Sequence, residues 1–229
     1  MTTLPREDHL VSAIESLNLN GASILAQVIP LAQIPEIIAR LPDLTNAGTR
    51  TLLSTQIGQE LAQQLLPIAQ AAIGSSAYPA RAILFDKSPT TNWNLGYHQD
   101  TKIPVREKHE MPGYTHWSVK EGIPHCRPPA EFLANMVALR VAIDANDDTN
   151  GPLLVSPTTH MRGFISADET NGIVEEKGQL QALTEPGDVV LMKPLTLHAS
   201  GKSTSPNRRR VIHIEYAGQP LPSPIQYFF

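Results

Sequence analysis

The chain has 229 residues, a length typical of a single all-β barrel domain, and its apolar share of 41% is sufficient for a sizeable core. A formal net charge of −4, with residues 208–210 as the one basic cluster, argues against nucleic-acid and anionic-membrane partners. Cys126 is the only cysteine, which excludes an intrachain disulfide, and neither a signal peptide in residues 1–8 nor an apolar stretch of membrane-spanning length is found. We therefore expect a soluble, cytoplasmic, single-domain protein.

The first third of the chain, residues 1–77, has the periodicity of amphipathic helices. Apolar residues recur at helical spacing in three segments, the third of which contains Pro67. We expect these stripes to pack against a sheet, so that the segment braces the rest of the domain. The three stripes are Leu10, Ile14 and Leu17; Ile34, Ile37, Ile38 and Leu41; and Ile57, Leu61, Leu65 and Ile68.

From Tyr78 onward the pattern changes to short strands separated by turn residues. A polar stretch, 166–178, follows the third expected strand, 153–156. Helices first and many short strands afterwards are typical of a β-barrel or jelly roll braced by N-terminal helices, with its core in residues 78–229. The expected strands are 80–86, 135–144, 153–156, 189–192 and 209–216.

Residues 101–130 fit neither periodicity. The segment is rich in proline and glycine, and it also carries aromatic and histidine residues, which argues against disorder. Since a long irregular loop is usually functional, we interpret it as a lid-like insert that contacts the substrate. Trp117, Lys120 and His125 are its candidate contacts, although exposure to solvent is the commoner outcome for a single residue of this kind.

The sequence His98-Gln99-Asp100, with His198 a hundred residues later, has the composition of a 2-His-1-carboxylate iron(II) site. Residues two apart on a strand share a face, so His98 and Asp100 can bind one ion. Such a site leaves three positions open, two for a bidentate 2-oxo acid and one for dioxygen. A lone His-x-Asp is common, and the distant His198 after an apolar strand is what makes the pattern informative.

Arg209 offers a planar fork for the carboxylate at the far end of such a 2-oxo acid. The alternation of strand 209–216 places it on one polar face with His213, whereas a solvated basic turn is the competing interpretation. His213 is a candidate for supporting the metal site or for plain core packing. Arg140 requires an anionic partner inside its strand, and a substrate or cosubstrate is one candidate. Asn135 is a further candidate contact to the cosubstrate.

Together these residues resemble the phytanoyl-CoA dioxygenase family of iron(II)/2-oxoglutarate oxygenases, over about residues 80–226. The resemblance implies a double-stranded β-helix, the cupin-like jelly roll, with iron held by His98, Asp100 and His198. It also implies that Arg209 binds the distal carboxylate of 2-oxoglutarate beside the hydroxyl of Ser200. The segments that carry it are Leu84-Phe85-Asp86-Lys87-Ser88 with Asn92-Trp93, His98-Gln99-Asp100, Asn150-Gly151-Pro152-Leu153, Gly187-Asp188-Val189-Val190-Leu191-Met192, His198-Ala199-Ser200-Gly201 and Arg209-Arg210-Val211-Ile212-His213-Ile214-Glu215-Tyr216.

The activity implied by this resemblance is hydroxylation of an unactivated C–H bond of a small molecule, with release of succinate and CO2. Some relatives carry a small residue in place of the ligand carboxylate and bind halide there, so Asp100 favours hydroxylation over halogenation. Desaturation and ring formation would use the same residues. The expected partner is a small-molecule substrate, and both a monomer and a homodimer remain open.

Two other function classes are compatible with parts of the pattern. A redox-inactive metal, such as zinc, on a cupin-like barrel would indicate an isomerase or hydrolase, but this alternative gives no reason for Arg209 at its spacing. A non-catalytic small-molecule binding protein of the same fold would be expected to have lost part of the ligand set. All three candidate ligands are present here.

Overall fold

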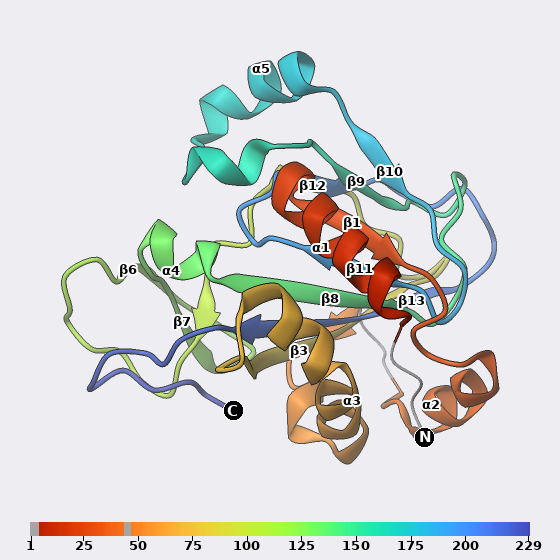
Figure 1. Cartoon of the computed structure of the whole chain (residues 1–229), viewed down its shortest axis with the longest axis horizontal. Helices are drawn as coiled ribbons and strands as arrows, with labels where there is room; N and C mark the ends of the chain where they lie inside the picture. Colours follow the sequence, from red (N-terminus) through yellow and green to blue (C-terminus); the bar gives the residue numbers. More distant parts are fainter. Residues whose placement is uncertain (1–4, 44–46) are drawn as a thin grey trace.

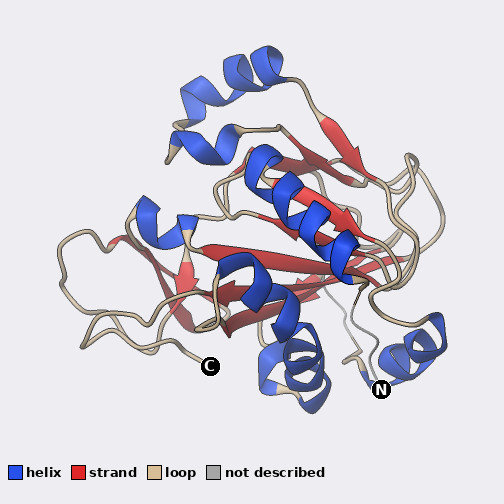
Figure 2. Ribbon diagram, viewed as in Figure 1, coloured by secondary structure: helices blue, strands red, loops and turns tan. Residues whose placement is uncertain are grey.

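The computed structural model describes residues 5–43 and 47–229, and two stacked sheets form its centre with helices outside them (Figures 1 and 2). The prediction that residues 1–8 form no signal peptide falls in part on residues 1–4, and these lie outside the described residues. Within the described part of the chain, no helix combines the length and the apolar character needed to cross a membrane.

Helices precede most of the strands, as the sequence predicts. α1 ends where Gly21 adopts a left-handed conformation and donates its N–H to the carbonyl of Leu17. α3 begins after Thr55, whose hydroxyl accepts from the N–H of Gly58. The helices are α1 (Glu7–Asn20), α2 (Ile34–Arg40), α3 (Gln56–Ile73), α4 (Ala130–Ala134) and α5 (Ala167–Lys177), with short 3-10 turns at η1 (Leu31–Gln33), η2 (Leu52–Ser54) and η3 (Thr159–Arg162).

The larger sheet has six antiparallel strands in the order β1-β11-β8-β13-β3-β2. One of its faces packs against α1, α2 and α3 in a single apolar cluster that includes Leu17, Leu61, Leu139 and Ile212. Its other face therefore looks into the interior of the barrel. The strands are β1 (Ala22–Leu25), β11 (Val189–Met192), β8 (Met136–Ala142), β13 (Arg209–Ala217), β3 (Tyr78–Lys87) and β2 (Gly48–Thr49).

A smaller antiparallel sheet lies opposite, in the order β10-β9-β12-β4. Two antiparallel sheets with this crossed strand order form a double-stranded β-helix, so the prediction of a mainly β jelly roll with N-terminal helices is confirmed. The strands are β10 (Leu180–Ala182), β9 (Leu153–Val155), β12 (His198–Ser200) and β4 (Leu95–His98).

The segment 101–130 is only partly irregular: residues 105–114 lie outside helices and strands, but other parts of it are regular, contrary to the sequence interpretation. It forms a third sheet, β5-β7-β6, whose hairpin turns at Glu121 and Gly122, both at positive φ. Ile103 and Cys126 are buried in a second, smaller apolar cluster, which also includes residues of β3, α4 and β8. Proline and polar residues interrupt the alternation that would have revealed these strands, which are β5 (Ile103–Pro104), β6 (Thr115–Lys120) and β7 (Ile123–Arg127).

One further expectation needs correction, and a stretch for which no element is predicted contains a helix. The segment 1–77 also contributes two strands, because β1 pairs with β11 and β2 pairs with β3. The polar stretch 166–178 contains α5, which begins with a capping box between Ser166 and Glu169. That Ser-x-x-Glu spacing was the available sequence signal for the helix.

Candidate metal and cosubstrate site

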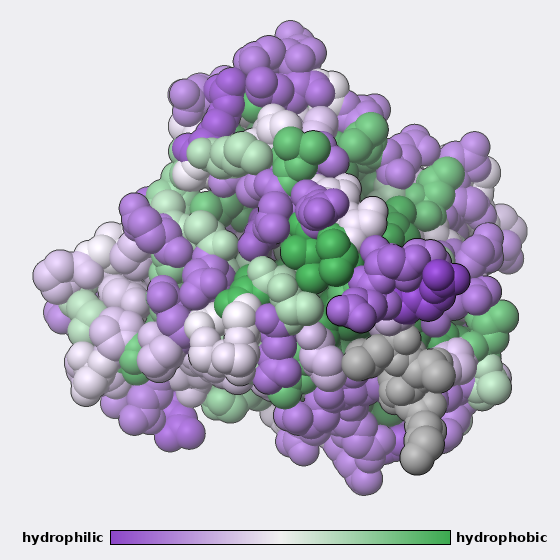
Figure 3. Space-filling view, viewed as in Figure 1, coloured by the Kyte–Doolittle hydropathy of each residue, from purple (hydrophilic) through white to green (hydrophobic). Residues whose placement is uncertain are grey.

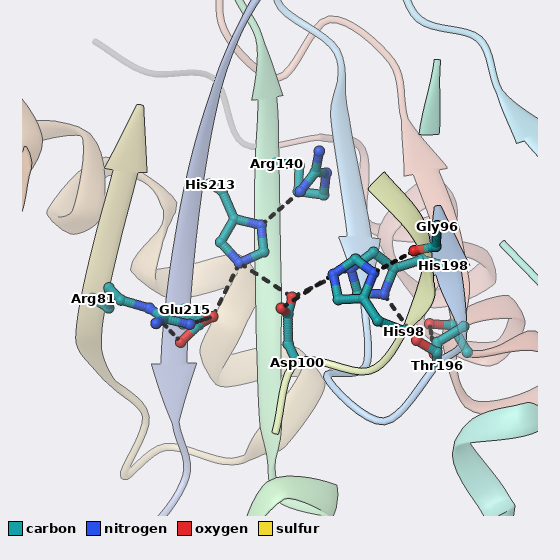
Figure 4. Close-up of polar contacts among 10 residues, drawn as sticks. Arg81, Gly96, His98, Asp100, Arg140, Thr196, His198, His213 and Glu215 are labelled. Carbon is teal, nitrogen blue, oxygen red and sulfur yellow. Dashed lines mark hydrogen bonds and ion pairs between the residues drawn. The ribbon is translucent and has the colours of Figure 1, made fainter. Parts of the chain in front are cut away.

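The structure brings His98, Asp100 and His198 together at one end of the smaller sheet (Figure 4). His98 ends β4 and His198 begins β12, and the two are direct partners in the antiparallel register, with ring centroids 4.2 Å apart. Asp100 follows β4, where its N–H donates to the carbonyl of Pro194. Nε2 of His198 lies 3.5 Å from Oδ2 of Asp100, and Nε2 of His98 lies 4.0 Å from Oδ1.

The tautomers of both histidines follow from their backbone contacts. Nδ1 of His98 lies 2.9 Å from the carbonyl oxygen of Gly96, and Nδ1 of His198 lies 2.9 Å from that of Thr196. Because a carbonyl can only accept, each Nδ1 carries the proton and each Nε2 has a free lone pair. The Nε2 lone pairs of His98 and His198 thus face the carboxylate of Asp100 with no proton between them. This donor set fits a divalent cation with the mixed nitrogen and oxygen preference of iron(II).

The charges of the site favour metal binding at neutral pH. Burial lowers the pKa of His198 to about 4, against the opposite effect of Asp100, so its imidazole is neutral. Burial alone would raise the pKa of Asp100, but the neighbouring His198 and His213 outweigh it and hold that pKa below its usual range. Asp100 is therefore a carboxylate and His198 a free base, the forms in which both residues bind metals.

Arg209 lies in the same cavity as the three candidate ligands and is only 2% exposed, which excludes the solvated basic turn. One guanidinium nitrogen donates to the carbonyl of Gly151 and lies 3.5 Å from Oδ1 of Asn146. Its Nε is buried without a hydrogen-bond partner in the described structure. Burial, and then the positive charge of Arg140, lowers the pKa of Arg209 to about 10. An incoming carboxylate would satisfy both the orphaned N–H and the buried charge.

Ser200 and Lys87 lie beside Arg209. The hydroxyl of Ser200 donates to the carbonyl of Gly151 at 2.8 Å and accepts from Nζ of Lys87 at 3.0 Å. Lys87 is fully buried, with Nζ 4.8 Å from the centre of the Trp93 ring, and burial lowers its pKa to about 8. No role for Lys87 is predicted from the sequence. A lysine that directly ends a buried apolar strand was the signal that could have identified it.

Two of the remaining candidates are buried at the site. Arg140 lines the cavity, and one of its guanidinium nitrogens lies 2.9 Å from Nδ1 of His213. Burial lowers the pKa of Arg140 to about 10, although Asp100 raises it. Asn135, in contrast, is not brought to the cavity, because it lies between α4 and β8, where its carbonyl accepts from the N–H of Gly218.

The candidates on the third sheet differ in their surroundings. Trp117 is half-buried against the small apolar cluster and donates from its indole to the carbonyl of Tyr114. Lys120 is exposed at the end of β6. His125 is fully buried with Nδ1 2.9 Å from the carbonyl of Ile123, and its Nε2 has no partner among the described residues.

A wider cleft opens beside the metal cavity. The two share Phe85, Trp93 and Leu95, so the cleft is directly adjacent to the cavity of the candidate ligands. Its volume is about 590 Å³, within the range of small-molecule sites. Arg50, between β2 and η2, and Glu121, in the β6–β7 turn, form an ion pair and line the cleft. The metal cavity itself is lined by Phe85, Trp93, Leu95, His98, Asp100, Arg140, Leu153, His198, Ala199, Ser200 and Arg209.

Comparison with known proteins gives a curated relative and solved structures of similar fold. Methylphosphonate hydroxylase from Gimesia maris is 27% identical over 93 residues, 39% of this chain and 36% of that protein, so the match spans about a third of the relative's length. EctD from S. alaskensis has a TM-score of 0.71 at 15% identity and covers 98% of this chain and 82% of its own. The epimerase SnoN from nogalamycin biosynthesis has a TM-score of 0.65 at 12% identity and covers 92% of this chain and 83% of its own.

These likenesses agree on one architecture. EctD has also been crystallised with 2-oxoglutarate, and SnoN with iron and α-ketoglutarate. Independently of them, residues 32–211 match the phytanoyl-CoA dioxygenase (PhyH) family, which covers most of the chain. The protein belongs to the phytanoyl-CoA dioxygenase (PhyH) family, and it shares the fold of solved enzymes that have been crystallised with 2-oxoglutarate.

Proposed function

We propose that this protein hydroxylates an unactivated C–H bond of a small-molecule substrate and releases succinate and CO2. In this proposal His98, Asp100 and His198 hold the iron, and Arg209 with Ser200 holds the distal carboxylate of 2-oxoglutarate. One observation carries the proposal: three proton-free metal donors and a buried arginine with an orphaned N–H face the same cavity.

Iron(II) supplies the activation of dioxygen, which is coupled to decarboxylation of the 2-oxo acid. The chain's own residues bind, orient and exclude water. Arg209 and Lys87 neutralise the distal carboxylate in a buried setting, where a charge-assisted hydrogen bond is strong. Phe85, Trp93 and Leu153 form apolar walls around the reacting centre.

Two points support hydroxylation over the other reactions of the superfamily. Asp100 occupies the third ligand position, so the site offers no vacant place for a halide of the kind that halogenation requires. In addition, the curated relative, which is 27% identical over 93 residues, is a hydroxylase. Epimerisation and ring formation would use the same donors.

The substrate enters, in this proposal, through the cleft that shares Phe85, Trp93 and Leu95 with the metal cavity. Its mixed apolar and charged lining suits a compact molecule with both an apolar face and polar groups. Trp117, Lys120 and His125 remain predicted substrate contacts, and His125 offers an unsatisfied ring nitrogen. Arg140 is a cation at the cavity wall that can take an anionic group of the substrate or cosubstrate.

Formation of succinate tests the proposal. Protein reconstituted with iron(II) and supplied with 2-oxoglutarate and dioxygen should form succinate, faster in the presence of substrate, and Asp100→Ala should not. Activity with zinc in the absence of oxygen would instead support a redox-inactive isomerase or hydrolase. Bound iron with no succinate formed at any substrate tested would contradict the oxygenase proposal.

A further inference from the structure

Four buried polar side chains form a connected row beside the candidate metal ligands (Figure 4). They are Arg140, His213, Glu215 and Arg81, and each is at most 8% exposed. Burying charged groups costs free energy unless they are partnered, and apolar residues would fill the same space more cheaply. The row therefore indicates a role beyond packing.

The strand register places each pair of this row face to face. Arg140 on β8 is the direct partner of His213 on β13, and Glu215 on β13 is the partner of Arg81 on β3. His213 and Glu215 are two residues apart, so they share the face of β13 that also carries Arg209. The row is thus built into the backbone pairing of three adjacent strands.

The contacts of His213 determine where its proton lies. A guanidinium can only donate, so Nδ1 of His213 accepts from Arg140 at 2.9 Å and the neutral ring carries its proton on Nε2. That nitrogen faces two carboxylates, with Oε1 of Glu215 at 3.1 Å and Oδ2 of Asp100 at 3.9 Å. The distance to Asp100 is longer than a hydrogen bond, and a modest rotation of the carboxylate would close it.

His213 is the neighbouring ring with an N–H on the side of Asp100, and because Glu215 accepts that single N–H at 3.1 Å, Asp100 can only share it. The other two rings near this carboxylate, His98 and His198, carry their protons on the far nitrogen and can only bind a cation or a donor. Among the described residues, no hydrogen bond reaches the carboxylate oxygens of Asp100 within 3.5 Å. A metal-binding carboxylate is normally oriented by a donor on its other side.

Glu215 in turn fixes the ring. Arg81 donates to it from Nε at 3.1 Å and from a second guanidinium nitrogen, which makes a two-point, buried ion pair. The positive charge of Arg81 outweighs the effect of burial and keeps the pKa of Glu215 below its usual range, so Glu215 remains an acceptor. His213 is therefore held from both sides, by Arg140 at Nδ1 and by Glu215 at Nε2.

We propose that His213 is a positioning residue: its single Nε2–H is shared between Glu215, which accepts it at 3.1 Å, and the carboxylate of Asp100, which it thereby orients for the metal ion, while Arg81 holds Glu215. This inference rests on the proposed function for its metal, and it assigns a task to residues beyond the ligand set. Arg140 lines the cosubstrate cavity and donates to His213. A ligand that contacts Arg140 would therefore also affect the orientation of Asp100, through His213.

The test compares metal affinity in matched variants. Anaerobic titration with cobalt(II) alone, followed by its visible absorption, gives the dissociation constant without 2-oxoglutarate or turnover. His213→Leu should raise this constant by about 10- to 100-fold, the usual effect of losing a group that orients a metal ligand. His213→Gln can place an amide N–H near the position of Nε2 and should restore most of the affinity.

Tyr216→Phe is the control for a purely structural effect. Tyr216 lies on the opposite face of β13, where its hydroxyl donates to the carbonyl of Ala62, so its loss should lower stability and leave cobalt affinity unchanged. If His213→Leu does not fold, His213→Asn replaces it, because its shorter amide reaches only the position of Nδ1. Weaker cobalt binding by His213→Asn than by His213→Gln is then the expected result.

Equal cobalt affinity in wild type and the donor-lacking variant overturns the inference, and so does an equal loss in Tyr216→Phe. The proposed function fails separately. If the wild type binds cobalt and iron but shows no charge-transfer absorption when 2-oxoglutarate is added to the iron form, the oxygenase proposal is wrong while the positioning role stands on the cobalt data.

Discussion

Ser200 and Arg209 donate to the same carbonyl oxygen, that of Gly151, although they belong to different sheets. Ser200 lies on β12 of the smaller sheet, and Arg209 lies on β13 of the larger one. This backbone oxygen thus links a strand of each sheet and holds the guanidinium of Arg209 on one side. The free side of Arg209 is left for a ligand, which is the arrangement that a carboxylate-binding site requires.

Arg209→Lys should weaken 2-oxoglutarate binding by about 10- to 100-fold, because it keeps the charge and loses the fork that makes charge-assisted bonds worth about 1.5–3 kcal/mol. The affinity is measured by titrating 2-oxoglutarate into the iron(II) protein under anaerobic conditions. Arg208→Lys is the matched control, since Arg208 is half exposed and pairs with Asp86. Equal affinities in both variants would remove Arg209 from the site.

Gly151→Ala should impair both stability and cosubstrate binding. Gly151 has φ +69°, and a Cβ there would lie 2.3 Å from the carbonyl oxygen of Gly201. We expect a loss of at least about 1–2 kcal/mol in the free energy of unfolding from the left-handed conformation alone. Gly172→Ala in α5 meets no atom within 4 Å and should be neutral or stabilise by about 0.5–1 kcal/mol. Urea unfolding of both variants distinguishes these outcomes.

Arg81→Leu should lower the free energy of unfolding by about 3–5 kcal/mol, because it leaves the buried carboxylate of Glu215 without its positively charged partner. The double variant Arg81→Leu with Glu215→Leu should be less destabilised than the sum of the single variants. A double-mutant cycle by chemical denaturation measures this coupling. Strict additivity would show that the two side chains do not depend on each other.

Stability should fall as the pH drops from about 6.5 toward 4, partly through His125. Burial lowers the pKa of His125 to about 4, so between these values the unfolded chain binds more protons than the folded one, and stability rises with pH. His125→Asn can keep the Nδ1 contact to Ile123 and should lose part of this dependence. His9→Gln, an exposed residue of α1, should retain it. Identical pH profiles for all three proteins would exclude a contribution of His125.

The side chains of the candidate metal site could be predicted to lie together because their spacing is local. His98 and Asp100 are two residues apart, and the alternation of residues 209–216 correctly placed Arg209 and His213 on one buried face and Ile212 on the other. Spacing and side-chain type carried this information without knowledge of the fold.

The rest depended on pairings between distant segments. Arg81 gains its importance only because the register places it opposite Glu215, and Lys87 only because β3 ends next to Ser200. Similarly, β1 lies in a segment with helical periodicity, and only its pairing with β11 shows that it is a strand. A sequence pattern cannot show which strands become neighbours, so these residues emerged from the structure alone.

The most direct test of the account is the visible difference spectrum of the anaerobic iron(II) protein on addition of 2-oxoglutarate, with Asp100→Ala alongside. A 2-oxo acid that chelates iron through its keto and carboxylate oxygens gives a weak charge-transfer band. We predict that the wild type shows this band and that Asp100→Ala does not. Wild-type protein that binds iron(II) and shows no band at saturating 2-oxoglutarate would contradict the assignment of this cavity.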